Sequence, residues 1–254
     1  MRSLFRSRVP APTPTVEPVP TIFPKIEGAD IAAVFVGRRV AGDFYDSVRV
    51  SSERVLLGLL DAAGRRDETR GVLTAAQQIF RNSGKELFSR QDLNESDAIT
   101  ELCLRLNHGL LEASSGVRSC PAFIACYHEK FGTLCYANAG HTPGLLRDST
   151  GIAELPSTSL PLGLFSHTTF NSPTAGLEKG AALLLVSRGV LECGADHDRS
   201  GGEFGLGGVK QLLQTAPPGR AQALCASILN AADEFCAGSP LHDDRTALAL
   251  VRTA

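Results

Sequence analysis

Residues 42–64 read GDFYDSVRVSSERVLLGLLDAAG. Residues 43–50 and 54–61 of this stretch are rich in Val, Leu and Phe, and a short polar turn separates them, so two successive β-strands are predicted. An aspartate lies at the start of the first strand and at the end of the second, namely Asp43 and Asp61. We therefore expect both carboxylates where a strand meets a loop, which is where binding and catalytic residues concentrate.

A third acidic motif, HDDRT at residues 242–246, runs into another predicted strand over residues 246–251. The three motifs hold carboxylates without paired His or Cys, which is a ligand set typical of Mg2+ or Mn2+ rather than zinc. Taken alone, each aspartate would equally well cap a strand end or accept the hydrogen bonds of a turn. Together the motifs predict one site for a hard cation, built from distant parts of the chain.

Outside these motifs the chain alternates runs of strands with pairs of helices. This order argues against β-α-β units and favours antiparallel sheets flanked by helices. We expect a meander of strands over residues 30–36, 43–50 and 54–61, and a hairpin over residues 122–127 and 134–139. Helices are expected over residues 71–90, 96–114, 209–215 and 220–235, the second with Ser96 as its N-cap.

Five segments follow one another along the chain: GDFYD at 42–46, DAAG at 61–64, YANAGHTP at 136–143, LPLG at 160–163 and DDRT at 243–246. In this order they resemble the motifs of the metal-dependent protein phosphatases of the PPM type, in particular the bacterial SpoIIE-like branch. The resemblance implies an α+β fold, which is a four-layer α/β/β/α sandwich of two antiparallel β-sheets flanked by helix pairs. The metal site of this fold lies at one end of the sandwich.

The resemblance also implies roles for single residues. Asp61 would bridge two Mn2+ or Mg2+ ions, and the carbonyl of Ala62 would complete the coordination of one of them. Asp243 would hold the other ion, unless Asp244 takes its place, and Asp43 would act on the first ion through water. Asp43 and Asp61 are thus the implied catalytic residues of a hydrolysis in which metal-bound water attacks phosphoserine or phosphothreonine.

One motif departs from the family pattern. An apolar strand over residues 183–186 runs into Ser187-Arg188-Gly189, where the family has a Thr-Asp-Gly turn whose aspartate is a metal ligand. A guanidinium is effectively always charged and cannot coordinate a cation. Arg188 therefore places one of the two metals in doubt, and it could instead bind the substrate phosphate through two hydrogen bonds.

Three further features have a structural and a functional interpretation. His141, in a loop beside a glycine, could act as a general acid, but a hydrogen bond that fixes the loop is the favoured interpretation. Asp46 is expected to support the site or a turn. The charged residues 65–71 predict a solvated turn, or else an altered surface for a phosphoprotein partner.

Composition excludes several classes of protein. The chain has 254 residues, 43% of them hydrophobic, which suffices for one sizeable core. Its formal charge of -2 argues against nucleic acid as a partner. No apolar run approaches the ~20 residues that span a bilayer and no secretory signal is recognised, so we expect a soluble cytoplasmic protein without a membrane partner. The seven cysteines lack C-x-x-C spacing and are predicted to be reduced, buried thiols.

The Pro-rich residues 1–24 are predicted to form a flexible tail, which either has no task or docks to a partner, and residues 25–254 to form the phosphatase domain. No sensory region precedes this domain, so we expect a regulator in trans. The resemblance implies a serine/threonine protein phosphatase of signal transduction, with a phosphorylated protein such as an anti-sigma-factor antagonist as its substrate. Arg188 favours the alternative of a catalytically impaired, phosphoprotein-binding regulatory module. A different carboxylate-metal hydrolase would explain the acidic residues but not residues 138–143.

Overall fold

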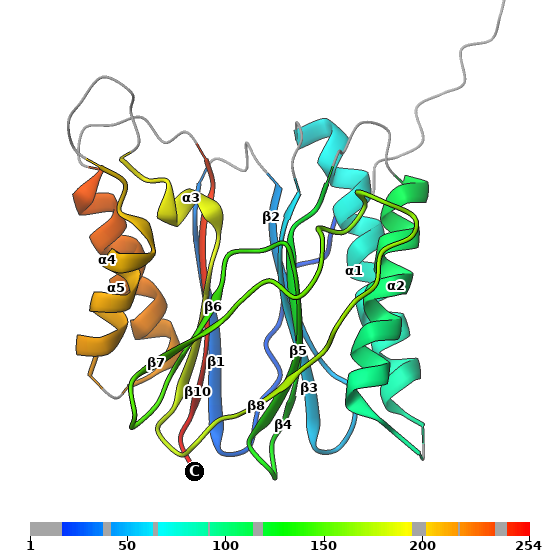
Figure 1. Cartoon of the computed structure of the whole chain (residues 1–254), viewed down its shortest axis with the longest axis horizontal. Coiled ribbons are helices and arrows are strands. Elements are labelled where there is room, and N and C mark those ends of the chain that lie inside the picture. The colour runs from blue at the N-terminus through cyan, green and yellow to red at the C-terminus, as the bar shows by residue number, and fades with distance from the viewer. Residues whose placement is uncertain are drawn as a thin grey trace, which may run out of the picture.

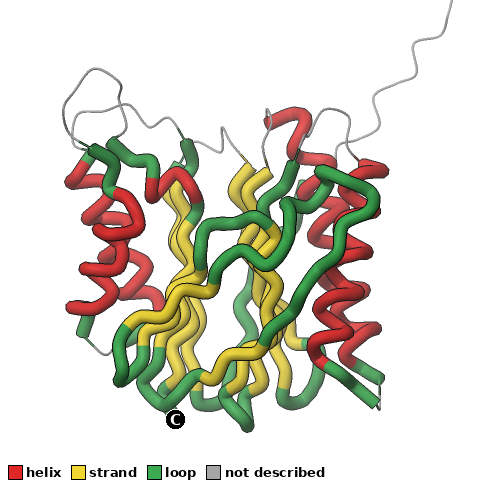
Figure 2. The backbone as a smooth tube through the Cα atoms, viewed as in Figure 1, coloured by secondary structure: helices red, strands yellow, loops and turns green. Residues whose placement is uncertain are grey.

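The computed structural model describes residues 17–37, 42–62, 66–90, 92–113, 119–194, 202–217, 219–236 and 243–254, with residues 66–68 described as backbone only. Two five-stranded antiparallel sheets lie face to face, and a pair of helices covers the outer face of each (Figures 1 and 2). This is the α/β/β/α sandwich that the sequence predicts, so the fold prediction is confirmed.

The first sheet has the strand order β2-β3-β4-β5-β8. Its strands are β2 (Gly42–Arg49), β3 (Arg54–Ala62), β4 (Ala122–His128), β5 (Thr133–Ala139) and β8 (Thr174–Gly176). The helices α1 (Arg66–Phe88) and α2 (Glu95–Ala113) cover its outer face (Figure 1). Because helices lie on one face and the second sheet on the other, β3 and β4 are buried along nearly their whole length.

The second sheet has the strand order β1-β10-β9-β6-β7. Its strands are β1 (Ala29–Val36), β10 (Arg245–Arg252), β9 (Ala182–Val186), β6 (Gly144–Arg147) and β7 (Ile152–Leu155). The helices α4 (Gly205–Thr215) and α5 (Ala221–Phe235) cover it, and the short helix α3 (Arg188–Leu191) follows β9. Within the described ranges, none of the helices is long and apolar enough to cross a membrane.

Three apolar layers hold the sandwich together. Leu57 and Leu59 of β3 lie between the sheets, in one cluster with Leu185 and Leu248 of the second sheet. Leu56 belongs to the cluster beneath α1 and α2, because successive side chains of a strand point to opposite faces. A third cluster lies between the second sheet and the helices α4 and α5.

The predicted meander is wrong at its first strand. β1 pairs with β10, and Ala29 lies opposite Arg252, whereas β2 begins the other sheet. The Asp30 carboxylate accepts a hydrogen bond from the Ala221 amide at the start of α5, over a distance of 2.9 Å. Contacts with the last strand and the last helix thus determine where β1 lies, and neither is local in sequence.

Two helix starts also differ from the prediction. α1 begins at Arg66, so most of the expected turn over residues 65–71 is the first part of a helix. α2 begins at Glu95, and the Asn94 side chain accepts the amide hydrogen of Ser96 at 3.0 Å, so Asn94 is the N-cap. Charged and polar residues are common both in turns and in the first turn of a helix, which is why the sequence alone misplaced these boundaries.

Residues 17–24 lie against the domain, where a flexible tail was expected over residues 1–24; residues 1–16 lie outside the described residues. The side chain of Gln77 on α1 exchanges two hydrogen bonds with the backbone of Val19. An extended segment can be held in this way because its backbone groups are not used within the segment itself.

The prediction of reduced cysteines is wrong for one pair. Cys193, just after α3, and Cys236, at the end of α5, form a disulfide with a Cα to Cα distance of 6.0 Å. The two residues are 43 positions apart in sequence, so spacing gave no indication of their contact. The prediction of buried free thiols is confirmed for the others, which are Cys103, Cys120, Cys126, Cys135 and Cys225.

Candidate functional site

Asp43 and Asp61 lie directly opposite each other where β2 and β3 pair. The neighbouring pair is Gly42 and Ala62, and a Cβ atom at position 42 would lie 2.2 Å from the Ala62 carbonyl oxygen. A side chain at position 42 would therefore push the two strand ends apart. Glycine at this position lets the two carboxylates share one end of the first sheet.

The second sheet reaches the same place through Thr246 of β10. The Thr246 hydroxyl donates a hydrogen bond of 2.7 Å to Asp43 Oδ2. Ser187, at the end of β9, fixes this threonine through two hydrogen bonds. The Ser187 amide donates to the Thr246 carbonyl over 2.9 Å, and the Thr246 amide donates to Ser187 Oγ over 3.0 Å. The site therefore lies between the ends of both sheets.

Burial raises the pKa of Asp43 to about 7. The negative charges of Asp61 and Asp243 act in the same direction, while hydrogen bonds from Ser187 and Thr246 lower the pKa. An isolated buried carboxylate resists ionisation because it loses its hydration. Asp43 thus lies where a nearby positive charge would strongly favour its ionised form.

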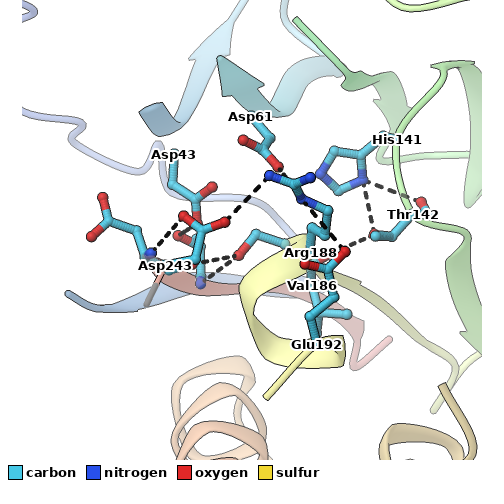
Figure 3. A network of polar contacts seen from close by, with 11 residues as sticks. Asp43, Asp61, His141, Thr142, Val186, Arg188, Glu192 and Asp243 are labelled. Atoms are coloured by element: carbon cyan, nitrogen blue, oxygen red, sulfur yellow. Dashed lines mark hydrogen bonds and ion pairs between the residues drawn. The ribbon is translucent and has the colours of Figure 1, made fainter. Parts of the chain in front are cut away.

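Helix α3 brings Arg188 to these carboxylates (Figure 3). Its Nε atom lies 3.8 Å from Asp61 Oδ2, and its Nη2 atom lies 3.4 Å from Asp243 Oδ2. Glu192, one turn later, lies 3.8 Å from the same Nε atom. The side chain of Arg188 is 54% exposed, so the guanidinium lies among the acidic groups and still reaches solvent.

The charges around Asp61 act in opposite directions. Burial raises its pKa, Arg188 lowers it, and the negative charges of Asp243, Glu192 and Asp244 raise it again. Acidic groups from β3, from α3 and from the start of β10 therefore act on one another at this end of the sandwich. Among the described groups that shift the pKa of Asp61, the guanidinium of Arg188 is the one cation.

The two neighbouring aspartates differ in their surroundings. Asp243 is partly exposed and pairs with Arg188. Asp244 is 2% exposed, and a Cβ atom at Gly37 would lie 2.1 Å from its Oδ1 atom. Of the two, Asp243 is the one whose carboxylate lies at the guanidinium, and its role as the favoured metal ligand stays a prediction. His242 lies outside the described residues.

The backbone of α3 lies very close to this acidic segment. A Cβ atom at Gly189 would lie 2.2 Å from the Asp244 carbonyl oxygen. No larger residue fits there without a shift of α3 or of the start of β10. Gly189 thus determines how closely Arg188 approaches Asp243.

Within the described residues, no three acidic, His or Cys side chains are already arranged to hold one metal ion. The groups present nevertheless fit Mg2+ or Mn2+, because all are oxygen donors and their negative charge is poorly compensated. The carbonyl of Ala62 lies at the same strand end as Asp61. A hard cation at this place would offset both the burial and the mutual repulsion that raise the pKa values of Asp43 and Asp61.

His141 fixes a loop, as the favoured interpretation expected. Its ring Nδ1 lies 3.1 Å from Thr142 Oγ1, and its backbone amide donates a hydrogen bond of 2.9 Å to the Asn138 side-chain oxygen. The Thr142 hydroxyl in turn donates to the Val186 carbonyl, next to the segment that carries Arg188 (Figure 3). Burial lowers the pKa of His141 to about 4, so the ring is neutral at pH 7.

Asp46 lies away from the other carboxylates. It is buried on the α1 side of β2, where Arg81 donates two hydrogen bonds of 2.6 and 2.8 Å to it. Three residues along a strand place two side chains on opposite faces, so Asp43 and Asp46 serve different surfaces. The expectation that Asp46 supports the site or a turn is therefore wrong: it lies within β2 and holds Arg81 on the face turned toward α1.

Sequence reasoning missed Ser187, Thr246 and Glu192 as members of the site. All three lie in or next to segments that were recognised for another residue. A hydroxyl where a strand ends or begins beside a recognised motif was the available signal for Ser187 and Thr246. The spacing of four residues from Arg188 was the signal for Glu192.

A sequence profile described as stage II sporulation protein E (SpoIIE) matches residues 51–253, which is more than half of the chain. The chain belongs to the SpoIIE family. Among curated proteins, this SpoIIE-family chain is similar to phosphoserine phosphatase RsbU of Bacillus subtilis (strain 168), with 25% identity over 236 residues. That match covers 91% of the chain and 66% of RsbU, so the chain spans slightly less than two thirds of this relative.

Solved structures share the fold of this SpoIIE-family chain. The RsbU and RsbW domains of Rv1364c from Mycobacterium tuberculosis match with a TM-score of 0.72 and 22% identity, over 91% of the chain and 62% of that protein. The SiaA-PP2C domain of Pseudomonas aeruginosa also matches with a TM-score of 0.72, at 17% identity, over 88% of the chain and 86% of that domain. At these identities the likeness concerns the fold alone.

Proposed function

We propose that the protein is a metal-dependent serine/threonine protein phosphatase. The observation that carries this proposal is the convergence of Asp43, Asp61 and Asp243 from three distant segments at one end of the sandwich. Membership of the SpoIIE family supports it, as does the name of RsbU, a phosphoserine phosphatase. The proposed substrate is a phosphorylated bacterial signalling protein such as an anti-sigma-factor antagonist, and a separate protein is the proposed regulator.

In this proposal Asp43, Asp61, Asp243 and the Ala62 carbonyl hold Mn2+ or Mg2+. A metal bound there supplies an activated water and positive charge for the phosphoryl oxygens. Thr246 orients the Asp43 carboxylate through its hydrogen bond. Asp244 remains the alternative ligand to Asp243.

Arg188 has a distinct role in the proposed reaction. A guanidinium carries donors in a planar fork that matches two phosphate oxygens. Arg188 is half exposed and lies beside Asp61, so it is placed to bind the phosphate of an approaching substrate. It would also supply the charge that one of the usual two metals supplies, and we propose that the site works with one metal fewer.

The second candidate function is a regulatory module that binds phosphoproteins without turning them over. The contact of Arg188 with both Asp61 and Asp243 favours it, because a resident guanidinium competes with a metal for these carboxylates. Both candidates use the same site, and they differ in whether phosphate is released.

Mn2+-dependent hydrolysis of an aryl phosphate tests the proposal. Wild-type protein should release phosphate only when Mn2+ is present, and Asp61→Asn should lower the rate at least about 100-fold, because an amide is a poor replacement for a ligand carboxylate. The matched control is Asp148→Asn, since Asp148 holds an exposed turn through Thr150, and it should retain wild-type turnover. Equal rates in the Asp61 variant and the wild type, with both proteins folded, would place the activity elsewhere.

A further inference from the structure

A pocket of about 380 Å³ lies beside Asp43. Three parts of the chain line it: residues 17–21, which we call the outer wall, the strands β1 and β2, and the start of α1. The residues that the strands and the helix contribute are Phe35, Asp43, Phe44, Tyr45, Thr69, Arg70 and Leu73. Asp43 belongs to both the pocket and the acidic site, so the pocket adjoins the site.

Specific hydrogen bonds hold the outer wall of the pocket in place. The Val19 amide donates to Gln77 Oε1 and the Gln77 side chain donates back to the Val19 carbonyl, both over 2.8 Å. Gln77 is 3% exposed, so this pair of bonds is shielded from water. A buried amide that satisfies both backbone groups of one residue holds that residue much as a neighbouring strand would.

A second anchor lies two residues further on. The Thr21 hydroxyl donates a hydrogen bond of 2.8 Å to the Tyr45 carbonyl, and its oxygen lies 3.1 Å from Asp46 Oδ1. Arg81 holds Asp46 in turn, and the ring of Phe23 stacks on Tyr45 with centroids 6.0 Å apart. Residues 17–24 are thereby fixed to β2 and α1 at several points.

The lining combines apolar surface with one charge pair. Phe35, Phe44 and Leu73 supply apolar surface, together with Pro18 and Pro20 of the outer wall. Such a mixture of apolar walls and few polar groups is typical of a binding pocket.

The charge pair joins Arg70, on α1, to Glu17, with Nη2 lying 3.4 Å from Oε1. The Glu17 side chain is 57% exposed. An exposed ion pair of this kind contributes little to the free energy of folding. Another carboxylate can therefore replace Glu17 on Arg70 at a small cost in free energy.

We propose that this pocket binds the residues that flank the phosphoserine of the substrate protein, and that it selects an acidic residue there. This inference rests on the proposed function. The flanking segment places an apolar side chain between Phe44 and Leu73, and its carboxylate takes the place of Glu17 on Arg70. Glu17 is then an internal competitor, which lowers the affinity for acidic substrates without blocking the phosphate site.

The test compares two synthetic phosphoserine peptides that differ only in Glu or Gln at a flanking position. Their kcat/KM values give a discrimination ratio for each protein in Mn2+. Wild type should favour the Glu peptide about threefold to fivefold, which is the range of a partly exposed charge pair. Arg70→Gln should bring the ratio to about one, while Glu17→Gln should raise it above the wild-type value.

The matched control is Lys85→Gln, which removes a positive charge from the last turn of the same helix, away from the pocket. Its ratio should equal that of the wild type. A wild-type ratio of one at every flanking position, or a ratio unaffected by Arg70→Gln and Glu17→Gln, would overturn the proposal.

Failure of the proposed function itself has a different signature, because the wild type would then hydrolyse neither the peptides nor an aryl phosphate. Fluorescence anisotropy of the same labelled peptides still tests the pocket in that case. Tighter binding of the Glu peptide that is lost in Arg70→Gln supports it, and equal binding of both peptides by all variants refutes it.

Discussion

The guanidinium of Arg188 lies between two carboxylates, Asp61 and Asp243, that would otherwise repel each other. In the metal-free protein it is a counter-ion, and a metal that binds here must compete with it. The convergence of Asp43 and Asp61 was predicted from sequence, because Asp43 begins one clear strand and Asp61 lies at the end of the next. The ion pairs of Arg188 were not, because they depend on the path of α3 after β9.

Arg188→Asp should raise the affinity for Mn2+ by more than about tenfold, since it removes a repulsive charge and adds a ligand. Arg188→Gln, which only removes the charge, should give an intermediate affinity. Calorimetric titration measures both. Unchanged affinity in both variants would mean that Arg188 points away from the metal. A turnover assay on Arg188→Asp separates two roles of the arginine. Turnover rises if Arg188 displaced a metal, and it falls if Arg188 binds the substrate phosphate.

His141 should make the protein sensitive to acid. Its pKa is about 4 when folded and about 6.5 when unfolded, so the unfolded chain binds more protons between these values and stability falls as the pH decreases. The loss should reach about 3 kcal/mol between pH 6.5 and pH 4. Urea denaturation of wild type and His141→Gln at several pH values measures the difference, and parallel pH profiles of the two proteins would contradict this assignment.

At the scale of elements, long apolar strands such as β3 and β4 were predictable because their burial on both faces leaves an uninterrupted hydrophobic run. The short strands β7 and β8 were not predicted, because few of their residues are buried and their pairing depends on neighbours distant in sequence. α3 was also missed, since its four residues carry too little periodicity. Its position depends on a close backbone contact at Gly189.

Gly189→Ala should lower the free energy of unfolding by about 1–3 kcal/mol, because its Cβ atom would lie 2.2 Å from the Asp244 carbonyl oxygen. The matched control is Gly207→Ala in α4, where nothing lies within 4 Å of the new Cβ atom and alanine favours the helix. Urea denaturation should show the control at least as stable as wild type; a similar stability for Gly189→Ala would disprove the close contact.

Across the whole molecule, the Cys193–Cys236 disulfide joins two segments that lead to the acidic site. Cys193 follows the helix that carries Arg188, and Cys236 ends the helix that precedes Asp243 in sequence. The buried position of the other cysteines was predictable from their apolar surroundings. The pairing was not, because two distant helix ends create it.

Reduction of this disulfide should destabilise the protein. A closed loop with a sequence separation of 43 residues corresponds to about 4 kcal/mol in the chain-entropy account, or a fall in Tm of roughly 8–16 °C. Differential scanning calorimetry with and without reductant measures it, and Cys193→Ser should melt at the reduced temperature in both conditions. Alkylation under denaturing conditions, followed by mass spectrometry, should count two more free thiols after reduction; seven free thiols beforehand would refute the bond.

The pairing of β1 with β10 has a consequence for the order in which the chain is made. Among the described strands, β1 leaves the ribosome first, yet β10, its partner in the sheet, is synthesised last. The meander β2 to β5, with α1 and α2, has all its partners early and can fold while synthesis continues. β1 must wait with an unpaired edge, and this interval is when the nascent protein is most exposed to aggregation and to chaperones.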